Sequence, residues 1–180
     1  MIKAVKYPVG VIVGTALFYF MASTFSFPVF SRTEFAPQYA FLAFAACLLG
    51  PVPGFLIGFL GHMLRDFFEG YGIWWSWVIC SGLVGFCSGF LADRTKLMDG
   101  ILEKSEVIRF VAGNLVIHMM AWVLLAPILD ILLYSRPASE VFKQGLTAAS
   151  IDFSLASLCG GVLLYGMTKC VNYIRSFRGR

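Results

Sequence analysis

Long apolar runs, separated by short stretches rich in charged residues, proline and glycine, dominate this chain. Runs of about 20 mostly apolar residues are typical of membrane-spanning helices. Proline, glycine and charged residues mark the places where such helices end. The pattern predicts loops at residues 93–106 and 134–145 and six helices, at residues 8–27, 37–49, 52–64, 72–92, 107–133 and 146–171.

The second and third predicted helices are short for a full span of the bilayer. They flank a sharp turn with the sequence GPVPG at residues 50–54. A short apolar run can still belong to a membrane helix. The helix can be tilted, or it can continue beyond the apolar run with polar residues that face protein rather than lipid. We therefore predict an all-α integral membrane protein, a compact bundle of six transmembrane helices that forms one domain over residues 1–180.

Composition supports the membrane class. Hydrophobic residues make up 59% of the chain and charged residues 13%, with a mean hydropathy of +0.81, whereas an ordinary soluble domain carries about 25% charged residues. The five cysteines lie in or beside apolar runs and show no C-x-x-C spacing. We interpret them as packing residues rather than zinc or redox sites.

The distribution of basic residues predicts the orientation of the bundle. Cytoplasmic loops carry an excess of Lys and Arg, and with six helices both termini lie on the same side. That side holds ten of the fourteen basic residues, namely Lys3, Lys6, Arg94, Lys96, Lys104, Arg109, Lys169, Arg175, Arg178 and Arg180. We therefore predict cytoplasmic N- and C-termini, and we attribute the net charge of +4 to topology rather than to nucleic-acid binding.

The stretch GHMLRDFF, residues 61–68, places three polar side chains at the outer end of the third predicted helix. His62 and Asp66 are four residues apart and share one helical face, with Arg65 beside it. Charged groups in a membrane usually face the bundle interior or a watery cavity. The alternative is an ion pair, between Arg65 and Asp66 or Glu69, that only terminates the helix.

Other polar and aromatic residues are expected at the same outer level. Tyr39 begins the second helix, and Asp130 and Asp152 lie near the outer ends of the fifth and sixth. An apolar, aromatic pocket with a few convergent polar groups is the usual form of a small-molecule site, although an aromatic belt at the interface also accounts for some of the rings. We predict a substrate site formed by Tyr39, His62, Arg65, Asp66, Tyr71, Trp74, Trp75, Asp130 and Asp152.

Motifs for catalysis are missing from the sequence. It has no H-E-x-x-H, G-x-S-x-G or C-x-x-C pattern, and no phosphate loop for ATP. The spacing of His62 and Asp66 also suits two metal ligands, which keeps a metal site open as an alternative. We predict that the chain is not an enzyme, that it holds no metal or cofactor, and that any energy for transport comes from other subunits.

Residues 9–92 carry a resemblance to a known family. The quoted segments FAPQYAFLAFAACLLGPVPGFLIGFLGHMLRDFF and GIWWSWVICSGLVGFCSG follow a long first helix. This order resembles the substrate-binding S components of energy-coupling factor (ECF) vitamin transporters, some of which share Gly-Pro-x-x-Gly-Phe, Gly-His-x-Leu-x-Asp and Trp-Trp-Ser-Trp motifs. Beyond residue 92 the resemblance rests on helix number and length alone.

The resemblance implies a function and partners. An S component binds a vitamin or related micronutrient at its extracellular end, in the plasma membrane of a prokaryote. It works with a membrane scaffold (T) subunit and with two cytoplasmic ATPases, which bind ATP and Mg. Family members carry a small-x-x-x-small motif in the first helix for the scaffold, usually with alanines. Gly10 and Gly14 are the best match here, and small residues four apart allow close helix contact.

The substrate remains open at this level. Members of the nearest group are linked to cobalamin and related corrinoids, or to queuosine precursors. The short predicted outer loops favour a cavity that stays open to a large ligand, so we expect cobalamin or a related corrinoid. A deazaguanine stacked between rings and read by Asp66 or Asp152 is the alternative, and a self-sufficient carrier or channel is a further one.

Overall fold

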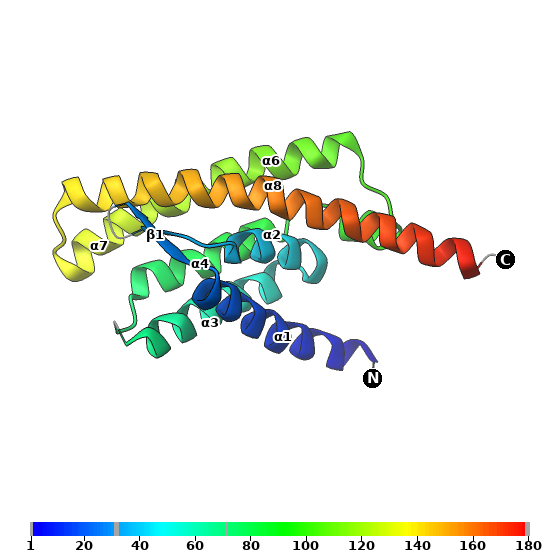
Figure 1. The fold of residues 1–180 in the computed structure, drawn as a ribbon, viewed down its shortest axis with the longest axis horizontal. Coiled ribbons are helices and arrows are strands. Elements are labelled where there is room, and N and C mark those ends of the chain that lie inside the picture. The colour runs from blue at the N-terminus through cyan, green and yellow to red at the C-terminus, as the bar shows by residue number, and fades with distance from the viewer. Residues whose placement is uncertain (1, 31–32, 71, 179–180) are drawn as a thin grey trace.

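A computed structural model describes residues 2–30, 33–70 and 72–178 of the chain (Figure 1). Helices form nearly all of it. The elements are α1 (Ile2–Thr24), β1 (Phe27–Phe30), β2 (Thr33–Phe35), α2 (Gln38–Leu49), α3 (Pro51–Glu69), α4 (Trp75–Ser88), α5 (Arg94–Met98), α6 (Lys104–His118), the π-helical segment η1 (Met119–Leu125), α7 (Ala126–Tyr134) and α8 (Ala138–Arg178).

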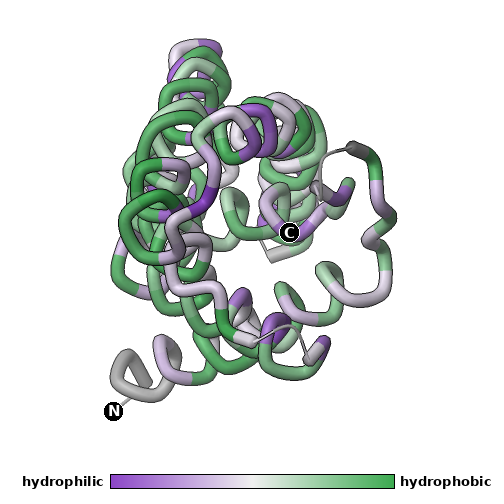
Figure 2. Tube along the Cα trace, turned by 90° about the vertical axis from the view of Figure 1, so that its left-hand side faces the viewer, coloured by the Kyte–Doolittle hydropathy of each residue, from purple (hydrophilic) through white to green (hydrophobic). Residues whose placement is uncertain are grey.

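Three helical stretches are long and apolar enough to cross a membrane. They are Tyr7–Thr24 in α1, Lys104–Tyr134, which runs through α6, η1 and α7, and Ala138–Phe177 in α8. Helices α2 and α4 are apolar but shorter, and α3 carries the polar residues of GHMLRDFF. Figure 2 shows hydrophobic colour along most of the tube. The membrane class is thus well supported, while the number of six spans stays a prediction.

Several predicted boundaries were wrong. The third helix does not end at residue 64 but continues to Glu69, because Arg65 and Glu69 form an ion pair across one helical turn and the polar face is turned toward protein. Gly70, with a φ of 77°, then ends the helix. The last helix begins at Ala138, inside the predicted loop 134–145, and runs without interruption through Gly160 and Gly161.

The chain also contains a β-hairpin that the all-α prediction missed. Strands β1 and β2 pair antiparallel, with Phe27 opposite Phe35 and their rings stacked at 4.7 Å between centroids. Thr33 Oγ1 donates a hydrogen bond of 3.4 Å to the Gln144 carbonyl of α8. Two strands of three and four residues are too short for an alternating pattern to reveal. The hairpin depends instead on its packing against α8 (Figure 1).

Helices α3 and α4 pack with their backbones in contact. A Cβ atom placed at Gly54 would overlap the carbonyl oxygen of Gly85, and one placed at Gly85 would overlap the carbonyl oxygen of Gly54. Side chains at either position would force the helices apart. The contact brings His62 of α3 within hydrogen-bonding distance of Ser81 of α4, which is the first step in building the site.

Gly10 and Gly14 lie against the protein's own helices. A Cβ atom at Gly10 would lie 3.1 Å from Leu49 of α2, and one at Gly14 would lie 2.5 Å from Ile57 of α3. The large exposed side chains of α1 lie elsewhere on the helix, with Ile12 68% exposed. This packing does not support the expectation that the two glycines form the contact with a partner subunit.

The two ends of the chain lie at the same end of the molecule (Figure 1), in agreement with the arrangement that the charge pattern predicts. The turn between α7 and α8 and the connection between α3 and α4 lie at the opposite end, near the hairpin (Figure 1). The cytoplasmic assignment of the termini rests on the distribution of the basic residues.

Candidate functional site

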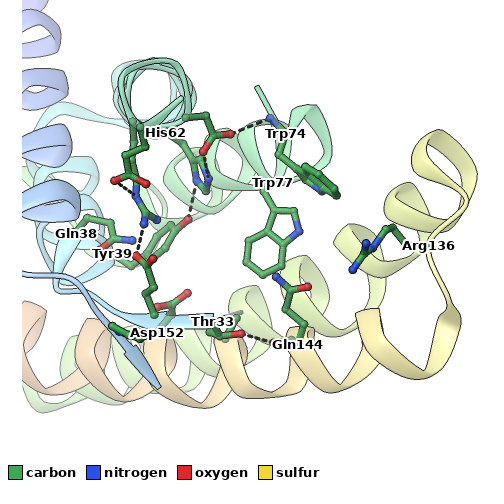
Figure 3. Close-up of a pocket in the computed structure, with 15 residues that line it drawn as sticks. Thr33, Gln38, Tyr39, His62, Trp74, Trp77, Arg136, Gln144 and Asp152 are labelled. Atoms are coloured by element: carbon green, nitrogen blue, oxygen red, sulfur yellow. Dashed lines mark hydrogen bonds and ion pairs between the residues drawn. The ribbon is translucent and has the colours of Figure 1, made fainter. Parts of the chain in front are cut away.

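A cavity of about 550 Å³ lies at the end of the molecule opposite to the termini. The hairpin, α2, α3, α4, α8 and the α7–α8 turn all contribute to its wall, which mixes aromatic rings with polar side chains (Figure 3). The lining residues are Pro28, Thr33, Glu34, Gln38, Tyr39, His62, Arg65, Asp66, Glu69, Trp74, Trp77, Arg136, Gln144, Ala148 and Asp152.

His62 is the centre of a buried hydrogen-bond network that runs from the cavity into the bundle. Its Nδ1 atom lies 2.6 Å from Ser81 Oγ and 3.2 Å from Tyr39 Oη, and these two hydroxyls are 2.7 Å apart. Its Nε2 atom faces Asp66 Oδ1 at 3.5 Å. Networks whose members are satisfied specify a single packing arrangement. The network therefore orients the Tyr39 and His62 rings in the cavity wall.

Asp66 joins this network to the start of the next helix. Its Oδ2 atom accepts a hydrogen bond of 2.9 Å from the backbone N–H of Trp74. Because Trp74 is the residue before the first turn of α4, Asp66 fixes the entry of the chain into that helix. The carboxylate also lines the cavity, so it has both a structural contact and access to a ligand.

Arg65 is held by two carboxylates. Its Nε donates to Glu69 Oε1 at 3.0 Å on the same helix, and a second guanidinium nitrogen pairs with Glu34 of the hairpin. The ion-pair alternative from the sequence therefore holds for Arg65, with Glu69 rather than Asp66 as its helical partner. The same side chain nevertheless lines the cavity and ties the hairpin to α3.

Asp130 lies behind the aromatic wall instead of lining the cavity. The indole N–H groups of Trp74 and Trp77 donate to its two carboxylate oxygens at 2.8 and 3.1 Å, and the Ser76 hydroxyl donates as well. Trp74 packs on Tyr134 with ring centroids 4.5 Å apart. One buried carboxylate thus sets the position of both indoles.

The π-helical segment supports the second of these indoles. Trp122 of η1 stacks on Trp77, with centroids 4.9 Å apart and planes 23° apart, and donates its indole N–H to His118 Nδ1 at 2.9 Å. The wide segment ends beside Pro127, which has no N–H to donate to the helix. π-helical segments frequently occur at functional sites, and this one places Trp122 behind the cavity wall.

Of the nine residues predicted for the site, six line the cavity: Tyr39, His62, Arg65, Asp66, Trp74 and Asp152. Asp130 lies behind the wall. Trp75 is 43% exposed and packs toward Phe59, so the two adjacent tryptophans point in different directions, as helical geometry requires. Tyr71 lies outside the described residues.

Trp77 is the most informative residue that the predicted site omitted. It lies three residues after Trp74, and this spacing places the two indoles on the same helical face. The hairpin residues Thr33 and Glu34 and the α8 residue Gln144 also line the cavity. Nothing in the local sequence connects the hairpin with α8, because more than 100 residues separate them.

A metal site finds no support in the described ranges 2–30, 33–70 and 72–178, where no group of three or more His, Cys, Asp or Glu side chains converges to hold an ion. His62 offers Nδ1 to hydroxyl groups and Nε2 to Asp66. The pair is therefore engaged within the protein. The cavity offers hydrogen-bonding groups and ring faces, the features of a binding site for a small organic molecule.

Comparisons with known proteins agree with this architecture. Residues 3–169 match the family model described as "ECF-type riboflavin transporter, S component". A UPF0397 protein of Lactococcus lactis subsp. cremoris (strain NZ9000) is 41% identical over 170 residues, covering 93% of each chain. A UPF0397 protein of Staphylococcus aureus (strain Mu3) is 35% identical over 162 residues, covering 89% of this chain and 88% of the relative.

A solved structure shares the fold. The crystal structure of FolT bound with folic acid superposes with a TM-score of 0.63 at 12% sequence identity, covering 86% of this chain and 93% of that one. S components are substrate-binding transporter subunits and not enzymes. The family match spans nearly the whole length, beyond the residues 9–92 that carried the resemblance, and the chain therefore belongs to the ECF-type S-component family.

Proposed function

We propose that this chain is the substrate-specificity subunit of an ECF transporter and captures a vitamin-type small molecule in the cavity opposite to its termini. The observation that supports this most directly is a 550 Å³ cavity with aromatic and polar walls at one end of an S-component fold. With cytoplasmic termini, the cavity faces the extracellular side of a prokaryotic plasma membrane.

The transport cycle in this proposal depends on partners. The sequence carries no phosphate loop, so ATP and Mg belong to two cytoplasmic ATPase subunits, and a membrane scaffold subunit connects them to this chain. Membership of the S-component family supports such an assembly over a self-sufficient carrier or channel. The chain contributes binding and release, and its partners contribute the energy.

The proposed substrate is a flat heteroaromatic vitamin or vitamin precursor rather than cobalamin. A volume of about 550 Å³ lies within the range of roughly 300–1,000 Å³ for drug-sized ligands, and cobalamin, with its macrocycle, amide chains and nucleotide, is larger than such ligands. The matching family model names riboflavin and the similar solved structure contains folic acid. Neither comparison supports the cobalamin preference drawn from the short loops.

Calorimetry on the purified protein tests the proposal. Riboflavin, folate, a queuosine precursor and cobalamin form the panel, and we expect saturable binding of a flat-ring compound and no binding of cobalamin. Trp77→Ala removes one ring of the wall and should weaken binding, whereas Phe67→Ala, at a side chain that is 65% exposed, serves as the matched control.

Uptake measurements separate the proposal from the carrier alternative. We expect uptake only when this chain is produced with its scaffold and ATPase subunits, together with co-purification of the complex. Uptake by the chain alone, without those subunits, contradicts the proposal and favours a self-sufficient carrier. Failure to bind any flat-ring compound of the panel contradicts the proposed substrate class.

A further inference from the structure

Two hydrogen-bond acceptors in the cavity wall are buried without a donor. Asp152 of α8 is only 5% exposed. Arg65 acts on it electrostatically, but its carboxylate has no hydrogen bond or ion-pair contact within the described part of the chain. Gln38 at the start of α2 is also 5% exposed, and its Oε1 atom has no partner there either. More than about 90% of buried polar groups in proteins are hydrogen-bonded, so both atoms call for a partner.

Neighbouring protein donors are already engaged elsewhere. The Arg65 guanidinium is held by Glu69 and Glu34, and the Tyr39 hydroxyl lies against Ser81 and His62. Both side chains line the same cavity as Asp152 and Gln38. We take the donors for Asp152 and Gln38 to come from the contents of the cavity, since neither acceptor has a hydrogen-bond donor among the described residues.

The other cavity-end carboxylates differ from Asp152 in this respect. Asp66 accepts from the backbone of Trp74, and Asp130 accepts from two indoles and a hydroxyl. Glu34 and Glu69 pair with Arg65. Asp152 is thus singled out as a buried carboxylate whose oxygens are free to accept from a ligand.

Position in the cavity adds a second constraint. Figure 3 shows Gln38, Tyr39 and Asp152 toward one end, Trp74 and Arg136 toward the other, and Trp77 between them. Trp77 and Asp152 therefore line neighbouring parts of the same cavity. This arrangement suits a flat ring that lies along the aromatic wall and directs one edge toward Asp152.

We propose that Asp152, assisted by Gln38, recognises a ligand edge with two adjacent N–H donors, as in the 2-amino-4-oxopyrimidine ring of pterins, guanines and 7-deazaguanines. The inference rests on the substrate-binding function proposed above and names its ligand class. In the proposed complex Asp152 is ionised, because two N–H donors stabilise the charged form of a carboxylate. It then accepts through two oxygens, and two parallel N–H···O bonds to it form a strong, geometrically specific pair. Gln38 Oε1 accepts from the remaining amino hydrogen.

The same acceptors disfavour related rings. In lumazine, xanthine and the isoalloxazine ring of riboflavin, the corresponding pyrimidinedione edge presents a single N–H between two carbonyl oxygens. The single N–H can still donate to one oxygen of Asp152. A ring carbonyl would then face the second carboxylate oxygen, and that oxygen and Gln38 Oε1 would be left without donors, which is unfavourable. The edge of the ring, rather than its size, therefore sets the specificity.

Matched ligand pairs test the assignment on the unmodified protein. Calorimetry compares pterin with lumazine and 7-deazaguanine with 7-deazaxanthine, so that within each pair only the 2-amino group is replaced by oxygen. We expect the 2-amino member of at least one pair to bind more tightly by about 10- to 100-fold, because charge-assisted hydrogen bonds are replaced by a repulsive contact. Equal affinities within both pairs would overturn the assignment.

Substitution of Asp152 tests whether this residue causes the preference for 2-amino ligands. Asp152→Asn replaces one acceptor oxygen by an NH2 donor, so it should weaken binding of the 2-amino ligand about 10- to 100-fold and reduce or invert the preference within the pair. Gln38→Leu should weaken binding about 2- to 12-fold. Asp99→Asn, the same change at an exposed carboxylate paired with Arg175, is the matched control and should leave affinity unchanged.

The outcomes distinguish the edge assignment from the function on which it rests. Tight binding of riboflavin or lumazine that Asp152→Asn does not change would overturn the assignment and leave an S component with another ligand class. No binding of any ring compound, together with no co-purification with scaffold and ATPase subunits, would overturn both. If Asp152→Asn does not fold, the comparison of ligand pairs on the unmodified protein decides.

Discussion

At the scale of single residues, the carboxylates around the cavity have different tasks. Asp66 connects His62 to the backbone of Trp74 and remains accessible from the cavity. Asp130 is withdrawn from the cavity and holds the Trp74 and Trp77 indoles from behind. These differences lead to different consequences for stability and for binding when each residue is changed.

Trp74 and Trp75 provide a matched pair of substitutions. Trp74 lines the cavity and Trp75 does not, and stacking of a heteroaromatic ring on an aromatic side chain contributes about 1–3 kcal/mol. Trp74→Ala should therefore weaken ligand binding about 5- to 150-fold, while Trp75→Ala should leave the dissociation constant unchanged. Calorimetry on both variants checks this, and an effect of Trp75→Ala equal to that of Trp74→Ala would contradict the site.

Removal of the Asp130 carboxylate should lower stability as well as affinity. Asp130→Ala leaves two indole N–H groups and the Ser76 hydroxyl without their acceptor, and each buried unsatisfied group costs about 1–3 kcal/mol. We expect a lower unfolding temperature and altered tryptophan fluorescence in the ligand-free protein. The fluorescence change is the decisive measurement. If Asp130 contacted only the ligand, its removal would not change the tryptophan fluorescence of the ligand-free protein.

At the scale of elements, the first helix has an inward and an outward face. Gly14 packs on Ile57, while Ile12 is exposed. In a membrane protein, exposed apolar side chains contact either lipid or another subunit. The assembly contact of α1 is therefore expected on the face that carries Ile12, and the small residues are expected to serve packing within the chain.

Substitution of Gly14 distinguishes these roles. Gly14→Leu forces a bulky side chain against Ile57, and overpacking of this kind costs about 1–3 kcal/mol, so the isolated protein should unfold at a lower temperature. Ile12→Trp, on the exposed face, should leave that temperature unchanged and reduce co-purification with the scaffold subunit. If Gly14→Leu instead unfolds at the normal temperature but no longer co-purifies with the scaffold subunit, the result would support the sequence-based prediction that the glycines contact that subunit.

At the scale of the whole molecule, the charge distribution and the position of the termini give a testable orientation. Ser105, at the start of α6, and Ser139, at the start of α8, are separated by the long helical stretch Lys104–Tyr134. Both residues are exposed. If that stretch crosses the membrane, the two serines lie on opposite sides of it.

Thiol labelling in intact cells tests the orientation. In a background in which the five native cysteines are replaced, Ser139→Cys should react with an impermeant reagent and Ser105→Cys should react only after the cells are opened. The native thiols must be removed because Cys87, Cys159 and Cys170 are exposed. Labelling of Ser105→Cys in sealed cells would reverse the predicted sidedness.

The sequence by itself determined the class of the protein and much of its helical order. The length of an apolar run and the placement of Lys and Arg can be read from each segment alone. Each membrane segment must satisfy its own backbone hydrogen bonds, and its own composition sets its free energy of transfer into lipid. The same local information identified GHMLRDFF as a cluster of polar side chains on one helical face. It also supported membership of the S-component family before any contact between helices was known.

Only the tertiary structure decided which of these residues face the cavity. Asp130 and Asp152 look equivalent in the sequence, since each is an acidic residue near the outer end of a predicted helix. Packing turns Asp130 toward the indoles behind the wall and leaves Asp152 in the cavity without a hydrogen-bond donor from the residues that the structure describes. Such assignments depend on contacts between residues far apart in the chain, and a local pattern of hydrophobic and polar positions does not record them.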